Sequence, residues 1–233
     1  AYLALYPQSK KPVGVNWPDE GKSREQALAT NGNLGLQLGP KSDVMDVDLD
    51  CREAKDLAQL ILPKPFAQFD RGTSDSGHYL YKAITCGPTK KFSGNGPKST
   101  LVELRGDGSQ TMIPPSIHPD GSRLNFTDIN QDAPEVEYAD LLKSVSLLAA
   151  CAEVAQLWVS GRRHELALSF SGLCLKQIVN PQLLINIIQR ICQTMGDRDE
   201  QDRMNCVRTS VGKPHDELRG FNGLVDCIGR AHV

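Results

Sequence analysis

Three aspartates stand at alternate positions in the segment Asp46-Val47-Asp48-Leu49-Asp50. In a β-strand, residues i, i+2 and i+4 point to the same face, so the three carboxylates would lie together there. Like charges at that spacing repel one another and raise one another's pKa unless a cation lies between them. The segment is therefore either an acidic strand end in water or a site for a hard cation such as Mg²⁺ or Mn²⁺.

Three further segments place polar side chains beside short apolar runs. Ser76-Gly77-His78 is a small-residue turn that leads into a predicted strand, and Glu103 and Arg105 alternate along another. Residues 114–121, with the sequence PPSIHPDG, follow closely. Each segment alone is weak evidence for a functional site. A single histidine at the start of a strand, for example, is more often a structural hydrogen-bonding group than a catalytic one.

A sheet is needed to bring these side chains together, and the first half of the chain predicts one. Its apolar runs are short and are separated by Gly- and Pro-containing turns. The predicted strands are Leu34–Leu38, Val44–Leu49, His78–Tyr81, Thr100–Leu104 and Thr111–Ile113. Between them, Arg52–Leu62 has helical spacing, and Pro63 ends it.

The second half predicts helices. From about Tyr138, apolar residues recur at helical spacing, and Pro181 suits the first turn of a later helix. The polar, turn-prone stretch Thr127–Pro134 is expected to be a linker. We therefore predict an α+β chain with two domains, residues 1–130 with the sheet and residues 131–233 as a small all-α helical bundle.

Composition restricts the class of protein. The chain of 233 residues has 39% hydrophobic and 23% charged residues, as in an ordinary globular protein, and no apolar run long enough to span a membrane. Its seven cysteines are scattered without a Cys-x-x-Cys pair, so we expect free thiols, no zinc site and a cytoplasmic location. The first residues do not resemble a signal peptide, and the absence of an initiator Met indicates a processed form or a fragment.

Taken together and in order, the motifs resemble the archaeo-eukaryotic primase superfamily, and within it the primase-polymerase (prim-pol) branch of plasmid, phage and mobile-element replication proteins. The matching pattern is a Gly-Pro turn, an hDhD strand (h, hydrophobic), an SGH turn, a strand with an acid, and a PPS-x-H segment. Here it runs from Gly39-Pro40 to His118. The resemblance implies a catalytic domain with an RRM-like sheet and flanking helices. A looser match extends it to a following helical bundle.

The resemblance assigns catalysis to Asp48, Asp50, Glu103 and His78. The three acids would bind two Mg²⁺ or Mn²⁺ ions, with Asp48 and Asp50 bridging both. The third acid is Glu103 where many relatives have Asp. Counting from the Gly-Pro turn leaves Asp46 deeper in the strand as a supporting or structural acid.

Nucleotide contacts are implied for a set of residues from three segments, namely Ser76, Gly77, His78, Arg105, Ser116 and His118. His78 would donate a hydrogen bond to the incoming triphosphate, and Gly77 lets the backbone approach the phosphates. The alternative for Arg105 is a salt bridge to Glu103. Ser116 and His118 could instead cap a turn.

Basic residues are candidates for nucleic-acid contacts, although the net charge of −2 shows no overall polycation. They are Lys90, Lys91 and Lys98 near glycines, and Arg162, Arg163 and Arg203 in the predicted bundle. A loop with several lysines is more often merely solvated.

The sequence therefore predicts a DNA primase/polymerase that makes primers from NTPs or dNTPs on a single-stranded DNA template. The resemblance also implies a helicase domain or subunit as a further partner. The alternative is a non-catalytic module that binds single-stranded nucleic acid; against it, aromatic residues are only 6% of the chain and do not cluster in sequence. A relaxase-like nuclease would need paired histidines, and no His-x-His motif occurs.

Overall fold

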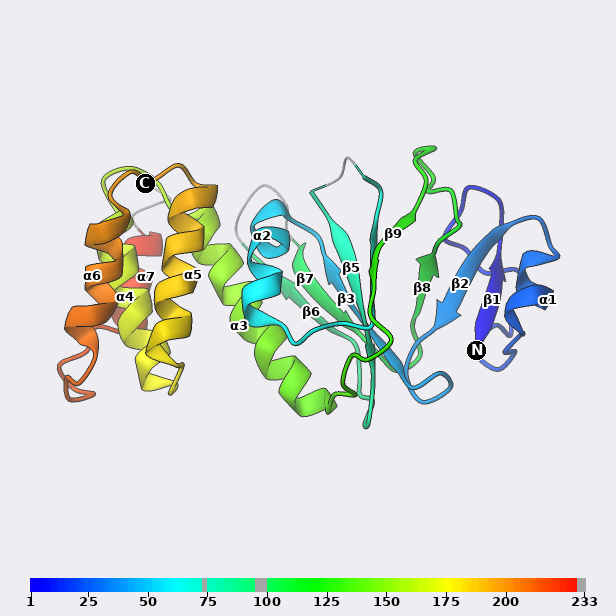
Figure 1. Cartoon of the computed structure of the whole chain (residues 1–233), viewed down its shortest axis with the longest axis horizontal. Coiled ribbons are helices and arrows are strands. Elements are labelled where there is room, and N and C mark those ends of the chain that lie inside the picture. Colours follow the sequence, from blue (N-terminus) through cyan, green and yellow to red (C-terminus); the bar gives the residue numbers. More distant parts are fainter. Residues whose placement is uncertain (73–74, 95–99, 230–233) are drawn as a thin grey trace.

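A computed structural model describes residues 1–72, 75–94 and 100–229. Strands occupy the N-terminal part and helices the C-terminal part (Figure 1). The strands are β1 Tyr2–Leu5, β2 Asn33–Gln37, β3 Val44–Leu49, β4 Ala67–Asp70, β5 Gly77–Lys82, β6 Lys90–Ser93, β7 Thr100–Arg105, β8 Gln110–Ile113 and β9 Asn125–Ile129. The helices are α1 Arg24–Leu28, α2 Arg52–Ile61, α3 Tyr138–Gln156, α4 Arg163–Lys176, α5 Pro181–Thr194, α6 Glu200–Ser210 and α7 Phe221–Gly229.

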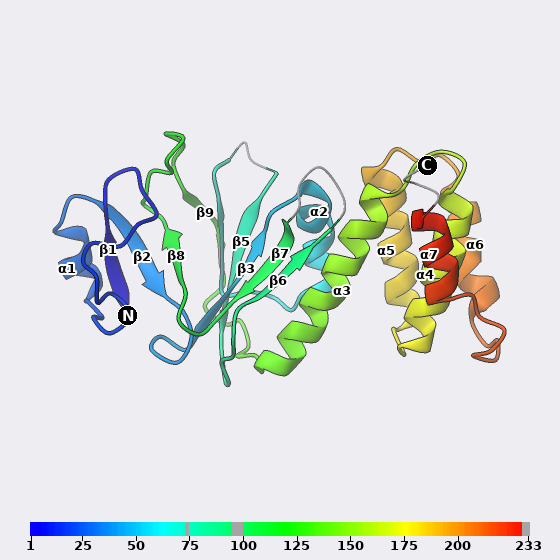
Figure 2. The ribbon, with the colours of Figure 1, turned by 180° about the vertical axis from the view of Figure 1, so that it is seen from behind.

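The strands form two antiparallel sheets. The larger has the order β6-β7-β3-β5-β4-β9, and the smaller has the order β1-β2-β8. Helices α2 and α3 cover one face of the larger sheet, and the smaller sheet lies on its other side (Figures 1 and 2). The predicted α+β class, with a sheet-containing N-terminal region followed by helices, is confirmed.

Strand β3 shows how the sequence builds this arrangement. Its apolar odd-numbered residues Met45, Val47 and Leu49 pack in the core shared with the helices. Alternation turns Asp46 and Asp48 to the opposite face. All six residues of the strand are buried, so its acids lie inside the protein and not at a free strand end.

The helical part is continuous with the sheet domain. One hydrophobic core joins the helix-facing side of β3, β5 and β7 to helices α2 to α6. Helix α3 packs against α2 and β7. This core includes residues from both sides of the predicted boundary between 130 and 131, and the division into two domains stays a prediction.

Several elements differ from the sequence-based expectation. The predicted linker Thr127–Pro134 begins inside β9, and Ala133 within it is buried. Strands β1, β4, β6 and β9 were not predicted, because each has only four or five residues and so gives a weak alternation signal. Within the described residues, no helix has both the length and the apolar character needed to cross a membrane.

Candidate active site

One row of side chains crosses the larger sheet on the face away from α2 and α3. Residues directly opposite each other in paired strands share a face. Five such opposed pairs, one for each pair of neighbouring strands, link the residues of this row. From β6 to β9 its members are Lys91, Glu103, Asp48, His78, Phe69 and Phe126. We call it the cross-sheet row. Two acids and a histidine occupy its centre, with a lysine at one end and aromatic rings at the other.

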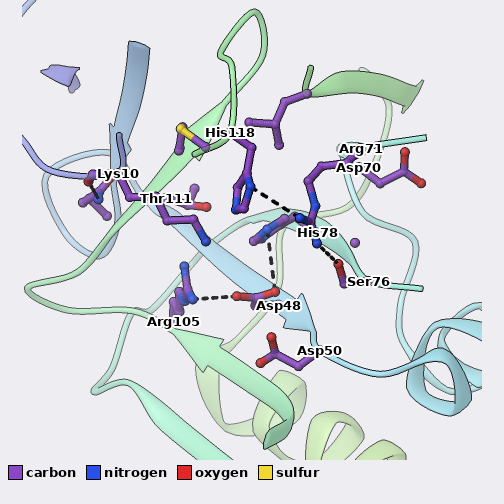
Figure 3. A pocket seen from close by; sticks show the side chains of 14 residues that line it. Lys10, Asp48, Asp50, Asp70, Arg71, Ser76, His78, Arg105, Thr111 and His118 are labelled. Carbon is purple, nitrogen blue, oxygen red and sulfur yellow. Dashed lines mark hydrogen bonds and ion pairs between the residues drawn. The ribbon is translucent and has the colours of Figure 1, made fainter. Parts of the chain in front are cut away.

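Asp48 lies between a guanidinium and an imidazole (Figure 3). Its Oδ2 accepts from Arg105 Nη2 at 2.6 Å, and its Oδ1 lies 3.6 Å from His78 Nε2. Arg105 Nε also donates to Glu103 Oε2 at 2.9 Å. The predicted alternative for Arg105, a pair with Glu103, thus forms, and the same guanidinium also reaches Asp48.

Asp50 directly follows β3, where its backbone N–H donates to the carbonyl of Leu101 at 3.0 Å. Burial first, and then the charges of Asp48 and Glu103, raise the pKa of Asp50 from 3.8 to about 6, although Arg105 opposes the shift. The charge balance follows from the groups present: the carboxylates of Asp46, Asp48, Asp50 and Glu103 outnumber the two cationic side chains paired with them, Arg105 and His78.

His78 is held on two sides. Its Nδ1 lies 3.0 and 3.3 Å from the two carboxylate oxygens of Asp46, and its ring stacks on Phe69 at 4.6 Å with an interplanar angle of 8°. Burial lowers the pKa of His78, but the charges of Asp46 and Asp48 outweigh it, so the pKa is raised. Burial likewise opposes ionisation of Asp46, yet His78 holds the pKa of that carboxyl below its usual value. The two side chains form a buried ion pair.

A cleft opens beside this ion pair. Most of the residues predicted to contact nucleotide line it, namely Ser76, Gly77, His78, Arg105 and His118. The cleft wall also includes Asp48 and Asp50, whereas Glu103 adjoins it through its register with Asp48. The structure thus brings together segments that are far apart in sequence.

Ser116 lies elsewhere. Its hydroxyl accepts from the backbone N–H of Leu34 at 2.9 Å and donates to the carbonyl of the same residue at 3.2 Å. Ser116 is buried and is not part of the cleft wall. Ser116 thus has a structural role, but it ties its segment to strand β2 and does not cap a turn as the predicted alternative had it, while His118 lines the cleft.

Sequence reasoning missed Asp70 and Arg71, which also line the cleft at the end of β4. Arg71 Nη2 donates to the hydroxyl of Ser76 at 3.2 Å, and its Nη1 pairs with Asp120 at 2.6 Å. Arg71 therefore links the SGH turn to the segment that carries His118. The available signal was a polar pair after a short apolar run, but the run was not recognised as a strand.

Strand register places Lys90 and Lys91 on opposite faces of the larger sheet. Lys91 is opposite Glu103 and so shares the face of the acids, whereas Lys90 is opposite Leu104 and shares the helix-covered face. Lys98 lies outside the described residues.

Phe126 contacts a second aromatic ring. Its ring meets Phe69 edge to face at 6.1 Å, and 42% of the residue is exposed on edge strand β9. Strand pairing thus brings together two aromatic residues that are distant in sequence, although the ring of Phe69 is buried and only Phe126 is exposed.

The bundle arginines are held in an ion-pair network. Arg163 Nη1 lies 3.2 Å from Asp197 Oδ1, and Arg203 Nε lies 3.0 Å from Asp197 Oδ2. Trp158 Nε1 donates to the same carboxylate at 3.0 Å. This geometry favours a structural role for Arg163 and Arg203 over nucleic-acid contacts.

The fold and this cleft define an α+β domain with an acidic, histidine-containing site on one face of its sheet. A family model described as the N-terminal domain of bifunctional DNA primase/polymerases (Prim-Pol) matches residues 1–139, more than half of the chain. The chain belongs to this DNA primase/polymerase family, and membership implies nucleotidyltransferase activity in general. No curated protein matches the chain.

The family generally uses divalent metals, so the donor set can be tested for fit. Asp48, Asp50 and Glu103 offer hard carboxylate oxygens and an excess of negative charge, which suit Mg²⁺ or Mn²⁺. Within residues 1–72, 75–94 and 100–229, no three or more His, Cys, Asp or Glu side chains converge closely enough to hold a metal. The donor chemistry thus fits a hard cation, whereas the carboxylates are not gathered around one point: Arg105 pairs with Asp48 and Glu103, and a bound cation would compete with it for both.

Proposed function

We propose that this chain is a DNA primase/polymerase that makes primers on single-stranded DNA by template-directed nucleotidyl transfer from NTPs or dNTPs. The observation that carries the proposal is the centre of the cross-sheet row, where Glu103, Asp48 and His78 are adjacent on three strands. Family membership supports the same reaction class.

Nucleotidyl transfer requires a bound triphosphate, an oriented 3′-oxygen and stabilisation of the charge that develops on the leaving pyrophosphate. Asp48, Asp50 and Glu103 would hold Mg²⁺ or Mn²⁺, which supplies Lewis-acid stabilisation of the attacking and leaving oxygens. His78 and Arg105 place positive charge in the cleft wall, where they can bind phosphate oxygens. Gly77 lets a phosphate approach the backbone closely.

Rigid strands position these groups. Asp48, His78 and Glu103 belong to the central paired strands of the sheet, so their backbones are fixed before any ligand binds. Arg105 pairs with the two acids when no other cation is present, and a triphosphate offers it an alternative anionic partner. Exchange of Arg105 from carboxylate to phosphate would couple nucleotide binding to cation binding.

The test is a primer-synthesis assay on single-stranded DNA with labelled NTPs or dNTPs and Mg²⁺ or Mn²⁺. The wild type is compared with Asp48→Ala/Asp50→Ala, with and without a preannealed primer. Products that form without a primer and vanish in the variant would support a primase.

Other outcomes separate the alternatives. Extension of a primer without new starts would indicate a polymerase whose initiation requires another component. DNA binding without any synthesis would overturn the proposal in favour of the non-catalytic binding module.

A further inference from the structure

Asp46 is a fully buried carboxylate at the centre of the larger sheet. It has no exposed surface and does not line the cleft. A buried carboxylate is strongly unfavourable unless it is paired and hydrogen-bonded. Its partner is His78, whose Nδ1 lies within 3.3 Å of both carboxylate oxygens.

The contacts of His78 leave only one of its nitrogens for a ligand. Because an ionised carboxylate only accepts hydrogen bonds, Nδ1 must carry the proton that it donates to Asp46. Phe69 stacks on the ring at 4.6 Å and opposes its rotation. Nε2 is the nitrogen that remains for a ligand, on the side of the cleft. It lies 3.6 Å from Asp48 Oδ1, which is too long for a strong hydrogen bond.

The pair is not explained as core packing alone. The side chain of His78 is 17% exposed and forms part of the cleft wall, whereas its partner carboxylate is inaccessible. A buried acid that fixes one nitrogen of a histidine while the other nitrogen faces a ligand site is the arrangement that orients functional histidines.

We propose that Asp46 is a positioning residue that holds the His78 ring so that Nε2, and not Nδ1, faces the phosphates of the nucleotide. The role of the nucleotide in this inference rests on the proposed function. Asp46 itself touches no ligand; it acts through His78.

The first test is a double-mutant cycle on nucleotide binding. The affinity of a non-hydrolysable dNTP analogue with Mg²⁺ is measured for the wild type, Asp46→Ala, Asp46→Asn, His78→Ala and Asp46→Ala/His78→Ala. Loss of a charged hydrogen bond should weaken binding about tenfold in Asp46→Ala, close to the effect of His78→Ala. The double variant should bind no more weakly than His78→Ala. Asp46→Asn, whose amide oxygen still accepts from Nδ1, should remain within about threefold of the wild type.

Controls exclude a general loss of structure. Asp128 on β9 pairs with Gln68 on the other face of the same sheet, so Asp128→Ala should leave nucleotide affinity unchanged. Thermal unfolding shows whether each variant is folded. Three results would each overturn the inference: an unchanged nucleotide affinity in Asp46→Ala, affinity losses that multiply in the double variant, or an equal loss of affinity in Asp46→Asn and Asp46→Ala.

A second readout needs no nucleotide. In ¹H–¹⁵N spectra of histidine-labelled protein, the Nδ1 proton of His78 should be protected from exchange in the wild type and in Asp46→Asn, and unprotected in Asp46→Ala. An unprotected Nδ1 proton in the wild type would overturn the positioning role. A wild type that has this protected proton but binds no nucleotide would instead overturn the proposed function, so the two failures are distinguishable.

Discussion

Two charged clusters in this molecule are built in opposite ways. In the bundle, the single buried carboxylate of Asp197 is paired with Arg163 and Arg203 and accepts from Trp158. In the sheet, several carboxylates share Arg105 and His78, and the pKa of Asp50 is raised to about 6. The bundle cluster is compensated, whereas the sheet cluster has an excess of negative charge.

The difference indicates which cluster is functional. A compensated buried network stabilises one arrangement and offers no binding capacity to a ligand. An excess of like charge inside a fold is unfavourable unless a cation or substrate restores the balance, which is why perturbed acids concentrate at functional sites. We therefore expect substitutions in the sheet cluster to change activity more than stability, and substitutions in the bundle cluster to do the reverse.

The largest expected effect is on catalysis by Asp48→Asn/Asp50→Asn. If these two carboxylates bind the metal as proposed, their removal should reduce primer extension at least about 1000-fold, because metal stabilisation of the transition state amounts to several kcal/mol. The variant should remain folded, because two repelling charges are lost. Extension assays and thermal unfolding measure the two properties together, and a variant that loses stability and activity in parallel would remove the contrast between the clusters.

The next effect is on stability, through Asp197→Ala. Deleting the shared partner removes the buried carboxylate from both arginines and leaves Arg203 only the exposed Asp199 and Asp202, so it should lower the free energy of unfolding by about 3 kcal/mol, as for other broken buried ion pairs. Urea denaturation followed by tryptophan fluorescence measures it. Asp202, whose side chain is 50% exposed beside Arg203, is the matched control, and Asp202→Ala should cost less than about 1 kcal/mol. Equal losses in the two variants would contradict the structural role of Asp197.

Much of the sheet cluster could be predicted from the sequence because its signals are local. The alternation of Asp46, Asp48 and Asp50 indicates a strand with acids on one face, and β3 has the predicted bounds. His78 and Glu103 were predicted as part of the site from the resemblance, and strand register places both beside Asp48. The metal-binding roles themselves stay a prediction.

The other residues of the site could not be predicted, because they come together only through contacts between segments that are far apart in sequence. Phe126 joins the cross-sheet row only because β9 pairs with β4, across more than fifty intervening residues. Arg71 enters the cleft through contacts with Ser76 and Asp120. For Ser116 the motif predicted too much. Its position indicated a ligand contact, but its hydroxyl is hydrogen-bonded to the backbone of Leu34.

A smaller effect should distinguish the two faces of strand β6. Lys91 shares the face of the acids and Lys90 does not, although both are exposed. Lys91→Ala should weaken binding of a primed template about fivefold and reduce the salt slope by about 1, as expected for one phosphate contact. Lys90→Ala should change neither quantity. Fluorescence anisotropy at several salt concentrations measures both, and equal effects from the two lysines would contradict the assignment of faces.

The smallest effect concerns the charge of Asp50 in metal-free protein. Its pKa is raised to about 6 in the fold, so the folded protein binds this proton more tightly than the unfolded chain. Stability from this group is therefore present at low pH and lost as pH rises from about 4 to about 6. Because Asp50 is only half-buried, the discounted gain for Asp50→Asn at pH 7.5 is about 1 kcal/mol, or about 2–4 °C in Tm.

Calorimetry in EDTA at pH 4.5 and pH 7.5 tests this sign. The advantage of Asp50→Asn over the wild type should grow with pH, because only the wild type must ionise a carboxyl next to Asp48 and Glu103. Added Mn²⁺ should stabilise the wild type more than the variant and so reverse the order, since only the wild type keeps all three carboxylates. A variant that is less stable than the wild type at pH 7.5 in EDTA would mean that the sheet cluster is compensated, like the cluster in the bundle.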